Sequence, residues 1–318
     1  MTKDFLKKSS YWTHGLVFLI LILWPQLGIA NTKSSPRHRG VTKQIPKSLL
    51  ISTGLPLCYW QASSFTNFGD FLSIKLVERI VNAPIATSRN GIPREQKKLL
   101  AIGSIIALAS DDDVVWGSGI NGKSVSSLQR YRFQHLDVRA VRGPLTRDFL
   151  MQNFHIDCPE VYGDPALLVP YFFPEFQKPE YPTQDFVIIP HYSELKMFPP
   201  SLYANVISPL EPWDQVISKI LNSRFVISSS LHGIVVAEAF GIPARLLKIT
   251  FNEPLFKYAD YYLGTQRPSF QYATSVEEAL LLGGEPPAKC DLQKLYQAFP
   301  FDYWPLSERK TINFPTEL

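Results

Sequence analysis

Cysteine is scarce in this sequence, which has three cysteines among 318 residues. Cys58, Cys158 and Cys290 are far apart, and neither a CxxC pair nor a cysteine–histidine zinc spacing surrounds them. This pattern excludes a disulfide framework and a zinc site of that kind, so we expect buried free thiols and no metal. The triplet Asp111–Asp113 contains the DxD pattern by which some glycosyltransferases hold a metal-bound nucleotide. It precedes an apolar run, however, and predicts a polar turn.

A strong excess of either charge is also missing, because 32 lysines and arginines stand against 28 acidic residues and leave a formal net charge of +4. This mildly basic balance gives no reason to expect nucleic acid, and it suits anionic ligands such as phosphates. Hydrophobic residues make up 45% of the chain and charged residues 19%. At this length, such a composition predicts a globular protein of two domains rather than one.

The N-terminus holds an apolar segment at residues 11–30, which follows three lysines among the first eight residues. It predicts a secretory signal peptide cleaved after Ala30, or a membrane anchor, since about 20 residues span a bilayer. Residues 31–48 carry five basic and no acidic residues and are typical of a flexible linker. We expect membrane association through residues 11–30 on an undetermined side, or export after cleavage near Ala30.

Strand-like and helix-like runs alternate from residue 49 onward. Strands are expected at 57–60, 99–102, 114–117, 137–141, 161–163, 186–190, 206–207, 225–228 and 244–249. Helices are expected at 70–81, 143–154, 212–222 and 231–240. Such alternation predicts parallel sheets covered by helices. Residues 170–182 contain four prolines and mark a domain boundary. We therefore expect one Rossmann-like domain at 49–180 and a second at 181–318, with a cleft between them.

The stretch from Ser228 to Gly233 places three serines and a histidine between two apolar runs. In an open α/β sheet, ligands bind where strand ends meet helix starts, and a helix start offers free N–H groups to an anion. The hydroxyls of Ser229 and Ser230, an open backbone at Gly233 and the imidazole of His232 suit such a site. The same residues equally suit an N-cap at Ser230 with a solvated histidine in the first turn.

Two further segments stand at the same predicted sheet edge. Asn67 and Asp70 flank the start of the first long helix, where an N-cap and a ligand contact are both reasonable. Arg139 and Arg142 straddle the end of the predicted strand 137–141, and charge inside an apolar run is costly unless it is paired. Arg142 suits bidentate binding of a carboxylate or phosphate, or else a salt bridge to an aspartate such as Asp164.

Taken in order, seven motifs resemble the polysaccharide pyruvyl transferase family, and most of all the bacterial exopolysaccharide ketal-pyruvate transferases of the succinoglycan type. The motifs are NFGD (67–70), LLAIGSI (99–105), DDDVVWGSGI (111–120), DVRAVRGPLTRDFL (137–150), YGDPALL (162–168), IIPHYSE (188–194) and SSSLHGIVVAEAFGIP (228–243). The resemblance implies a fold similar to the GT-B glycosyltransferases, with two facing Rossmann-like domains. It also implies transfer of the enolpyruvyl group of phosphoenolpyruvate onto two hydroxyls of a glycan or lipid-linked sugar, without metal or cofactor.

By the same resemblance, His232 matches a catalytic histidine, which would act as the general acid that protonates the donor, and Arg142 matches a donor-binding arginine. Ser229, Ser230 and Gly233 would cradle the donor anion, Asn67 and Asp70 would line the cleft, and Arg139 and His191 are weaker candidates. Some members carry arginine where this chain has Ser230, so a second cation is sought among Lys123, Arg139 and Lys248. Two alternatives stay open: a glycosyltransferase with a sugar-nucleotide donor, and a non-catalytic glycan-binding protein at the cell surface.

Overall fold

The computed structural model describes residues 54–304 and 311–315. The segments expected to be a signal or anchor (1–30) and a linker (31–48) lie outside the described residues. Within the described part of the chain, no helix combines the length and the apolar character needed to span a membrane.

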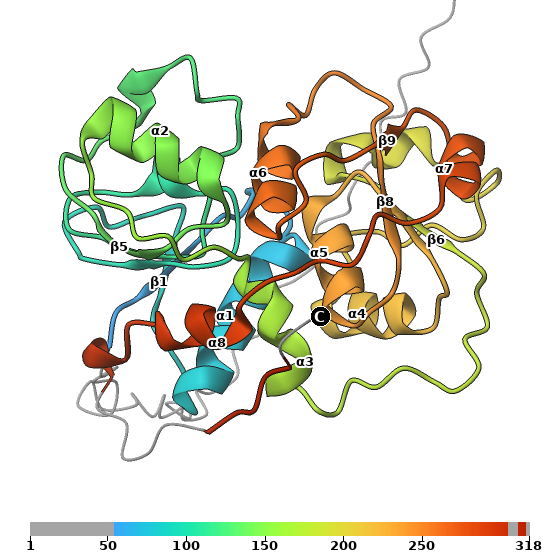
Figure 1. Ribbon diagram of the computed structural model, residues 1–318, viewed down its shortest axis with the longest axis horizontal. Helices are drawn as coiled ribbons and strands as arrows, with labels where there is room; N and C mark the ends of the chain where they lie inside the picture. The colour runs from blue at the N-terminus through green and yellow to red at the C-terminus, as the bar shows by residue number, and fades with distance from the viewer. Residues whose placement is uncertain (1–53, 305–310, 316–318) are drawn as a thin grey trace, which may run out of the picture. The chain divides into compact units, whose positions relative to one another are not determined.

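The first sheet is parallel throughout, with five strands in the order β2-β1-β3-β4-β5 (Figure 1). Its strands are β1 (Leu57–Tyr59), β2 (Thr87–Arg89), β3 (Leu99–Leu100), β4 (Val114–Trp116) and β5 (Asp137–Ala140). The central strands β3 and β4 are apolar and fully buried, as expected when helices and loops cover both faces of a parallel sheet.

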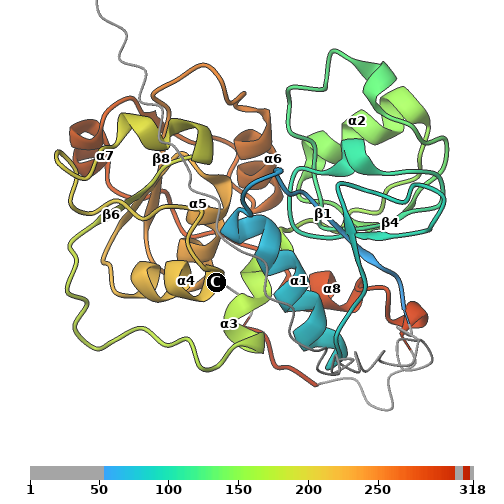
Figure 2. The same cartoon turned by 180° about the vertical axis from the view of Figure 1, so that it is seen from behind.

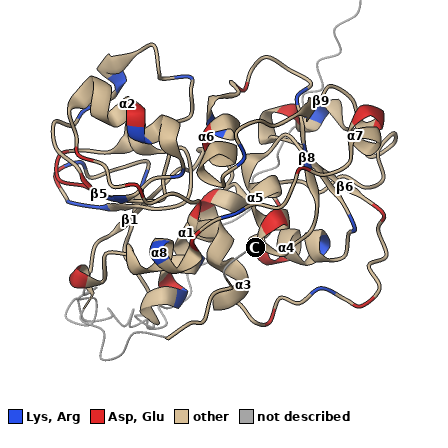
Figure 3. Cartoon of the chain, in the orientation of Figure 1, with Lys and Arg blue, Asp and Glu red and all other residues tan. Residues whose placement is uncertain are grey.

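The second sheet is also parallel, with four strands in the order β6-β7-β8-β9. Its strands are β6 (Val187–Ile189), β7 (Val226–Ser228), β8 (Ala244–Leu247) and β9 (Tyr272–Ala273). The chain is thus an α/β protein with two parallel sheets, which confirms the class that the alternating pattern predicted. Acidic and basic residues are interspersed over the elements around both sheets (Figure 3).

Eight helices occur among the described residues. They are α1 (Phe68–Val81), α2 (Pro144–Phe154), α3 (Val169–Phe172), α4 (Trp213–Leu221), α5 (Leu231–Ala239), α6 (Phe256–Gly264), α7 (Val276–Leu282) and α8 (Leu292–Gln297). Helix α1 begins where the Asn67 side chain accepts a hydrogen bond from the Gly69 N–H at 2.9 Å. It ends at Asn82, which takes a left-handed conformation with φ of 52°. The expected N-cap is confirmed.

Helix α8 comes late in the chain but packs beside the first sheet. The indole N–H of Trp116 on β4 donates to the Leu295 carbonyl oxygen at 2.8 Å, and α8 also contacts the turn η4 (Pro165–Leu168). Figure 2 shows α8 next to α1, which itself contacts α3, α4 and η4. Side chains from both sheets and these helices contribute to one large apolar cluster.

The structure differs from the sequence-based expectation mainly in short elements. Residues 161–163 and 206–207 were expected to be strands, but each forms a single bridge, between Val141 and Tyr162 and between Ile188 and Val206. The elements that the pattern did not predict are β2, α3, α6, α7, α8 and β9. Strands β2 and β9 have only three and two residues, too few to show an alternating pattern.

Candidate active site

A cavity of about 320 Å³ lies where the carboxyl ends of strands from both sheets meet. Its polar lining comes from the turns after β1, β3, β4, β6, β7 and β8: Asn67, Asp70, Ser104, Asn121, Lys123, Ser124, Arg130, His191, Ser230, His232, Glu253 and Lys257. Its apolar and aromatic lining consists of Trp60, Ile105, Ala107, Leu108, Tyr192 and Leu231. The volume and the mixed lining are those of a small-molecule site.

His232 lies in the first turn of α5 and reaches the cavity, although only 9% of it is exposed. Its Nε2 has no hydrogen-bond partner among the described residues and lies 3.7 Å from Oδ2 of Asp164, which likewise lacks one. Burial, reinforced by the charges of Arg142 and Lys257, lowers the pKa of His232 to about 3. The imidazole is therefore neutral near pH 7, and it is not the solvated first-turn histidine of the N-cap alternative.

Helix α1 leaves room for this histidine because residue 69 has no side chain. A Cβ on Gly69 would lie 2.1 Å from the His232 Nδ1 atom, which is far inside van der Waals contact. The glycine of the NFGD motif thus allows α1 and α5 to approach each other closely, and it sets the place of the imidazole.

Asp70, one residue further on, lines the same cavity. Burial raises the pKa of its carboxyl to about 7, and Asp164 adds to the rise while Lys257 opposes it. The neighbouring carboxyl of Asp164 has a pKa raised to about 6, again mainly by burial. The cavity therefore holds a carboxyl that is partly protonated near neutral pH and a histidine that is neutral there.

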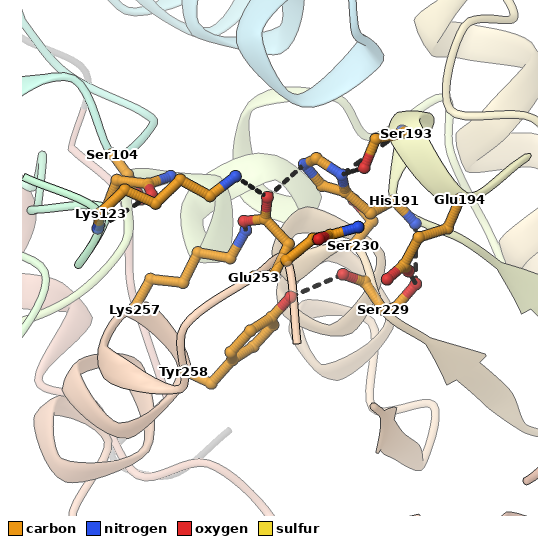
Figure 4. Close-up of polar contacts among 12 residues, drawn as sticks. Ser104, Lys123, His191, Ser193, Glu194, Ser229, Ser230, Glu253, Lys257 and Tyr258 are labelled. Carbon is orange, nitrogen blue, oxygen red and sulfur yellow. Dashed lines mark hydrogen bonds and ion pairs between the residues drawn. The ribbon is translucent and has the colours of Figure 1, made fainter. Parts of the chain in front are cut away.

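A cluster of charges closes one side of the cavity, and Figure 4 shows it converging on Glu253. The Lys257 ammonium donates to Oε2 of Glu253 at 2.5 Å, the Lys123 ammonium bonds to Oε1, and Nε2 of His191 lies 3.7 Å from Oε1. Burial alone would raise the pKa of Glu253, but the charge of Lys257, the neighbouring His191 and the hydrogen bonds from both lysines lower it. Burial, followed by the charge of Lys257, lowers the pKa of His191 to about 4.

The two lysines differ in exposure. The side chain of Lys257 is 6% exposed and burial lowers its pKa, whereas that of Lys123 is 47% exposed. Lys257 was not expected from the sequence, because α6 was not predicted. Lys248, another expected cation, donates to the carbonyls of Thr250 and Glu253 and lies outside the cavity lining.

Arg142 lies just behind the cavity wall and is fully buried. Its Nε donates to Oδ2 of Asp260 at 3.0 Å, its Nη2 to the Ile120 carbonyl, and its Nη1 to the hydroxyl of Ser104 at 2.6 Å. Ser104 lines the cavity, so the positive charge of Arg142 acts on the cavity from behind this hydroxyl. The expected salt bridge exists, but its partner is Asp260.

The serines after β7 face different ways. Ser230 lines the cavity at the start of α5, and its side chain makes no cap bond. The hydroxyl of Ser229 instead donates to Glu194 at 2.5 Å and accepts from the His191 N–H at 2.8 Å (Figure 4). A Cβ on Gly233 would lie 2.4 Å from the Ser228 hydroxyl, so this glycine permits close packing of the helix on the sheet.

Arg139 is held away from the cavity lining. Its guanidinium bonds to Asp137 two residues earlier and to Asp302, and it is one-third exposed. Of the expected site residues, the structure brings Asn67, Asp70, His191, Ser230 and His232 together around the cavity. Arg142, Ser229 and Gly233 pack directly behind them.

Residues 117–124, GSGINGKS, match the P-loop pattern GxxxxGK[ST] and follow a buried strand, a signal that was not used in the sequence analysis. The structure does not form a phosphate cradle there, because several N–H groups bond to the protein. Gly117 N–H donates to Ala140, Gly119 N–H to Gly103 and Ile120 N–H to Thr146. Residues 123–126 form turns instead of a helix. The pattern does, however, mark Lys123 as a cavity residue.

Among the described residues, no group of three or more His, Cys, Asp or Glu side chains is placed so that it could hold a metal ion. The DDD triplet is a turn, as expected: Asp113 forms a buried ion pair with Lys98 at 2.9 Å, and Asp111 accepts from the Gln134 and His135 N–H groups. The three cysteines are free and buried.

Comparison with known proteins points to one family. A model of the polysaccharide pyruvyl transferase family matches residues 67–249, more than half of the chain. An uncharacterised protein of Acanthamoeba polyphaga mimivirus is 26% identical over 232 residues, covering 68% of this chain and 78% of that protein. The succinoglycan biosynthesis protein ExoV of Rhizobium meliloti is 28% identical over 240 residues, covering 71% and 70%.

Among solved structures, an uncharacterised protein from Klebsiella pneumoniae superposes with a TM-score of 0.40 at 11% identity, over 69% of this chain and 93% of that one. The family match contains β2 to β8 and the segments that carry Asp70, Arg142, Asp164 and His232. By this match the chain belongs to the polysaccharide pyruvyl transferase family.

Proposed function

We propose that this protein transfers the enolpyruvyl group of phosphoenolpyruvate onto two hydroxyls of a glycan or lipid-linked sugar, forming a cyclic pyruvate ketal and releasing phosphate. Family membership implies a transferase that acts on a glycan. The name of the Rhizobium relative adds support for a role in exopolysaccharide biosynthesis. The observation that carries the proposal is the cavity itself, which combines a carboxyl with a raised pKa (Asp70), a histidine with a lowered pKa (His232) and a buried lysine (Lys257).

The donor carries a phosphate and a carboxylate, so its site needs cations and N–H donors. Lys257 and Lys123 supply charge at one side of the cavity, and Arg142 supplies more from behind Ser104. The first N–H groups of α5 have no partner within the helix, and the positive end of its dipole lies at Ser230. Together these groups are suited to a small ligand with two anionic ends.

The reaction begins with a proton that must reach the methylene carbon of the donor. Asp70, with a pKa of about 7, holds such a proton, whereas His232, with a pKa of about 3, is free to accept one. An anionic donor raises the pKa of both groups. We therefore assign proton donation to Asp70, in place of the His232 expected from the sequence, and proton acceptance to His232.

In this scheme, Asp70 protonates the methylene carbon, which becomes a methyl group, and C2 becomes electrophilic. One sugar hydroxyl adds to C2 and gives its proton to His232. The bond between C2 and the phosphate oxygen then breaks, and the phosphate leaves, taking up the proton from His232. The second hydroxyl adds to C2 and returns a proton to Asp70. The products are the ketal and hydrogen phosphate.

The proposal is tested by phosphate release from phosphoenolpyruvate with a panel of oligosaccharides, using the protein from Leu49 onward. We expect turnover with at least one acceptor, and Lys257→Met to raise the KM for the donor. Lys75→Met, at a half-buried lysine of α1 that pairs with Glu78 and lies outside the cavity lining, is the matched control. The proposal is overturned if the protein shows no turnover with any acceptor and does not bind the donor. Thermal protection by a sugar nucleotide alone would favour a glycosyltransferase, and glycan binding without any turnover would favour a non-catalytic protein.

We also propose that residues 11–30 attach the full chain to a membrane. Lysate fractionation of the full chain and of the chain from Leu49 provides the test. The full chain is expected in the membrane pellet and the shortened chain in the supernatant. If expression of the full chain instead yields a product that is cleaved near Ala30 and lies outside the membrane fraction, export is supported.

A further inference from the structure

Three aromatic side chains gather at one wall of the cavity. The rings of Trp60 and Tyr192 are stacked with centroids 5.5 Å apart and planes at 29°. The Phe65 ring packs against both, 6.2 Å from Trp60 and 5.2 Å from Tyr192. Trp60 directly follows β1 of the first sheet, and Tyr192 lies in the turn after β6 of the second sheet.

This cluster differs from the aromatic clusters of the core. Trp60, Phe65 and Tyr192 are each only partly buried, and Trp60 and Tyr192 line the cavity. Core aromatics such as Trp116 are buried completely against other apolar side chains. Partly exposed aromatic rings beside a polar cavity leave an apolar surface that a bound molecule would cover.

Phosphoenolpyruvate would not cover that apolar area, because it is small and carries an anionic group at each end. A pyranose ring is different: its C–H groups form an apolar face, while its hydroxyls project from the edge. The Tyr192 ring lies 4.4 Å from the ring of His191, which belongs to the charge cluster around Glu253. The aromatic wall therefore adjoins the polar part of the cavity, and Asn67 and Asn121 offer amides to hydroxyls in the same cavity.

We propose that Trp60 and Tyr192 form the acceptor subsite, where a pyranose ring of the acceptor packs its C–H face against the two side chains. The inference rests on the proposed function, since it assumes that a sugar enters this cavity. It assigns binding of the acceptor to the aromatic wall and binding of the donor to the lysine side.

The test compares Tyr192→Leu and Trp60→Leu with Tyr192→Phe and Trp60→Phe in the full chain. Loss of one aromatic contact is expected to raise the acceptor KM about 3- to 10-fold, because such contacts contribute on the order of 1 kcal/mol. The donor KM should stay unchanged, and the phenylalanine variants should retain most of the acceptor affinity. Tyr181→Leu, at a tyrosine that is 74% exposed and outside the cavity lining, is the matched control.

The outcomes separate the two proposals. If the parent protein turns over phosphoenolpyruvate and the leucine variants keep the parent acceptor KM, the subsite is wrong while the function stands. The same conclusion follows if donor and acceptor KM rise together. If the parent protein neither binds nor turns over the donor, the function fails. Glycan-array binding by the parent that weakens in the leucine variants would still support the aromatic subsite.

Discussion

Asp70 and His232 line the same cavity and respond to burial in opposite ways. Loss of water disfavours the charged form of each group, so it raises the pKa of the acid and lowers that of the base. The result is an acid that stays protonated up to about pH 7 in the same cavity as a base that stays neutral well below that pH. Neither pKa was predictable from the sequence, because both depend on how tightly α1 and α5 pack.

Asp70→Asn should reduce turnover at least 100-fold, the scale on which a positioned proton donor contributes. The asparagine keeps the size of the side chain and removes the transferable proton. In the parent protein, the protonated fraction of Asp70 falls as the pH rises through about 7, so donor turnover should decline across that pH range. Initial rates from pH 5.5 to 8.5 provide the measurement. A rate that keeps rising up to pH 8.5 would contradict the assignment of Asp70 as the acid.

The same substitution should change the pH dependence of stability. Because the folded-state pKa of Asp70 is raised to about 7, the folded protein binds more protons than the unfolded chain between about pH 4 and 7. Its contribution to stability is therefore present at pH 4 and lost as the pH rises to 7. Relative to the parent, Asp70→Asn should gain about 1–3 kcal/mol in free energy of unfolding between pH 5 and 8. Urea denaturation at both pH values measures the gain, and equal pH profiles would exclude a raised pKa.

At the scale of elements, the contact between α1 and α5 holds the acid–base pair together. Gly69 provides the space for the imidazole, and Asn67 starts the helix on which both Gly69 and Asp70 lie. The sequence predicted the N-cap, because Asn followed by an apolar helical pattern is a local signal. It did not predict the reason for the glycine, because that reason lies in a helix far along the chain.

Gly69→Ala should cost about 1–3 kcal/mol of stability and displace His232, since the new methyl group would collide with the imidazole. Turnover should fall as well, although residue 69 offers no chemical group. The matched control is the pair His232→Ala and Gly69→Ala/His232→Ala. With the imidazole removed, the two closest clashes (2.1 and 2.4 Å) disappear, while the Cβ of residue 232 still lies 2.7 Å away, so Gly69→Ala should cost clearly less stability in the His232→Ala background than in the parent. Additive losses in thermal denaturation would show that the clash lies elsewhere.

At the scale of the whole described chain, a buried ion pair joins the segment after β5, which carries Arg142, to α6, which carries Asp260. Arg142 and Asp260 are both fully buried, and Asp260 also accepts from the N–H and the hydroxyl of Thr146 at the start of α2. Helices α2 and α6 are in contact around this pair. The arginine was predicted to be functional or paired, but its partner could not be foreseen because α6 was not predicted.

Asp260→Asn should therefore destabilise the protein by about 3–5 kcal/mol, since it leaves a buried guanidinium without its counter-charge. Arg142→Leu/Asp260→Leu should recover part of that loss, because neither variant side chain is charged. Denaturant midpoints of the three proteins give the comparison. If Asp260→Asn matches the parent in stability, the pair is not a link between α2 and α6.

Most of what the sequence allowed us to predict concerns local or repeated patterns. The β–α alternation predicted two parallel sheets. It also placed candidate ligand contacts in the segments after β6 and β7, and His191, Ser230 and His232 do line the cavity. Lys257, Glu253, Trp60 and Tyr192 were not expected there. Trp60 directly follows β1, Tyr192 lies in the turn after β6, Glu253 lies in a loop, and Lys257 lies in α6, which was not predicted. Only the packing of distant segments brings these side chains to one cavity.

Glu253 has one more consequence. Its carboxylate binds both lysines where we expect the donor, so the ligand-free cavity already contains its own counter-anion. An incoming ligand must exchange partners with Glu253 and not simply fill a vacant positive site. A doubly anionic donor can compensate for that exchange at two places at once, whereas the released phosphate has lost the carboxylate. Competition from the Glu253 carboxylate thus favours binding of intact phosphoenolpyruvate and release of phosphate.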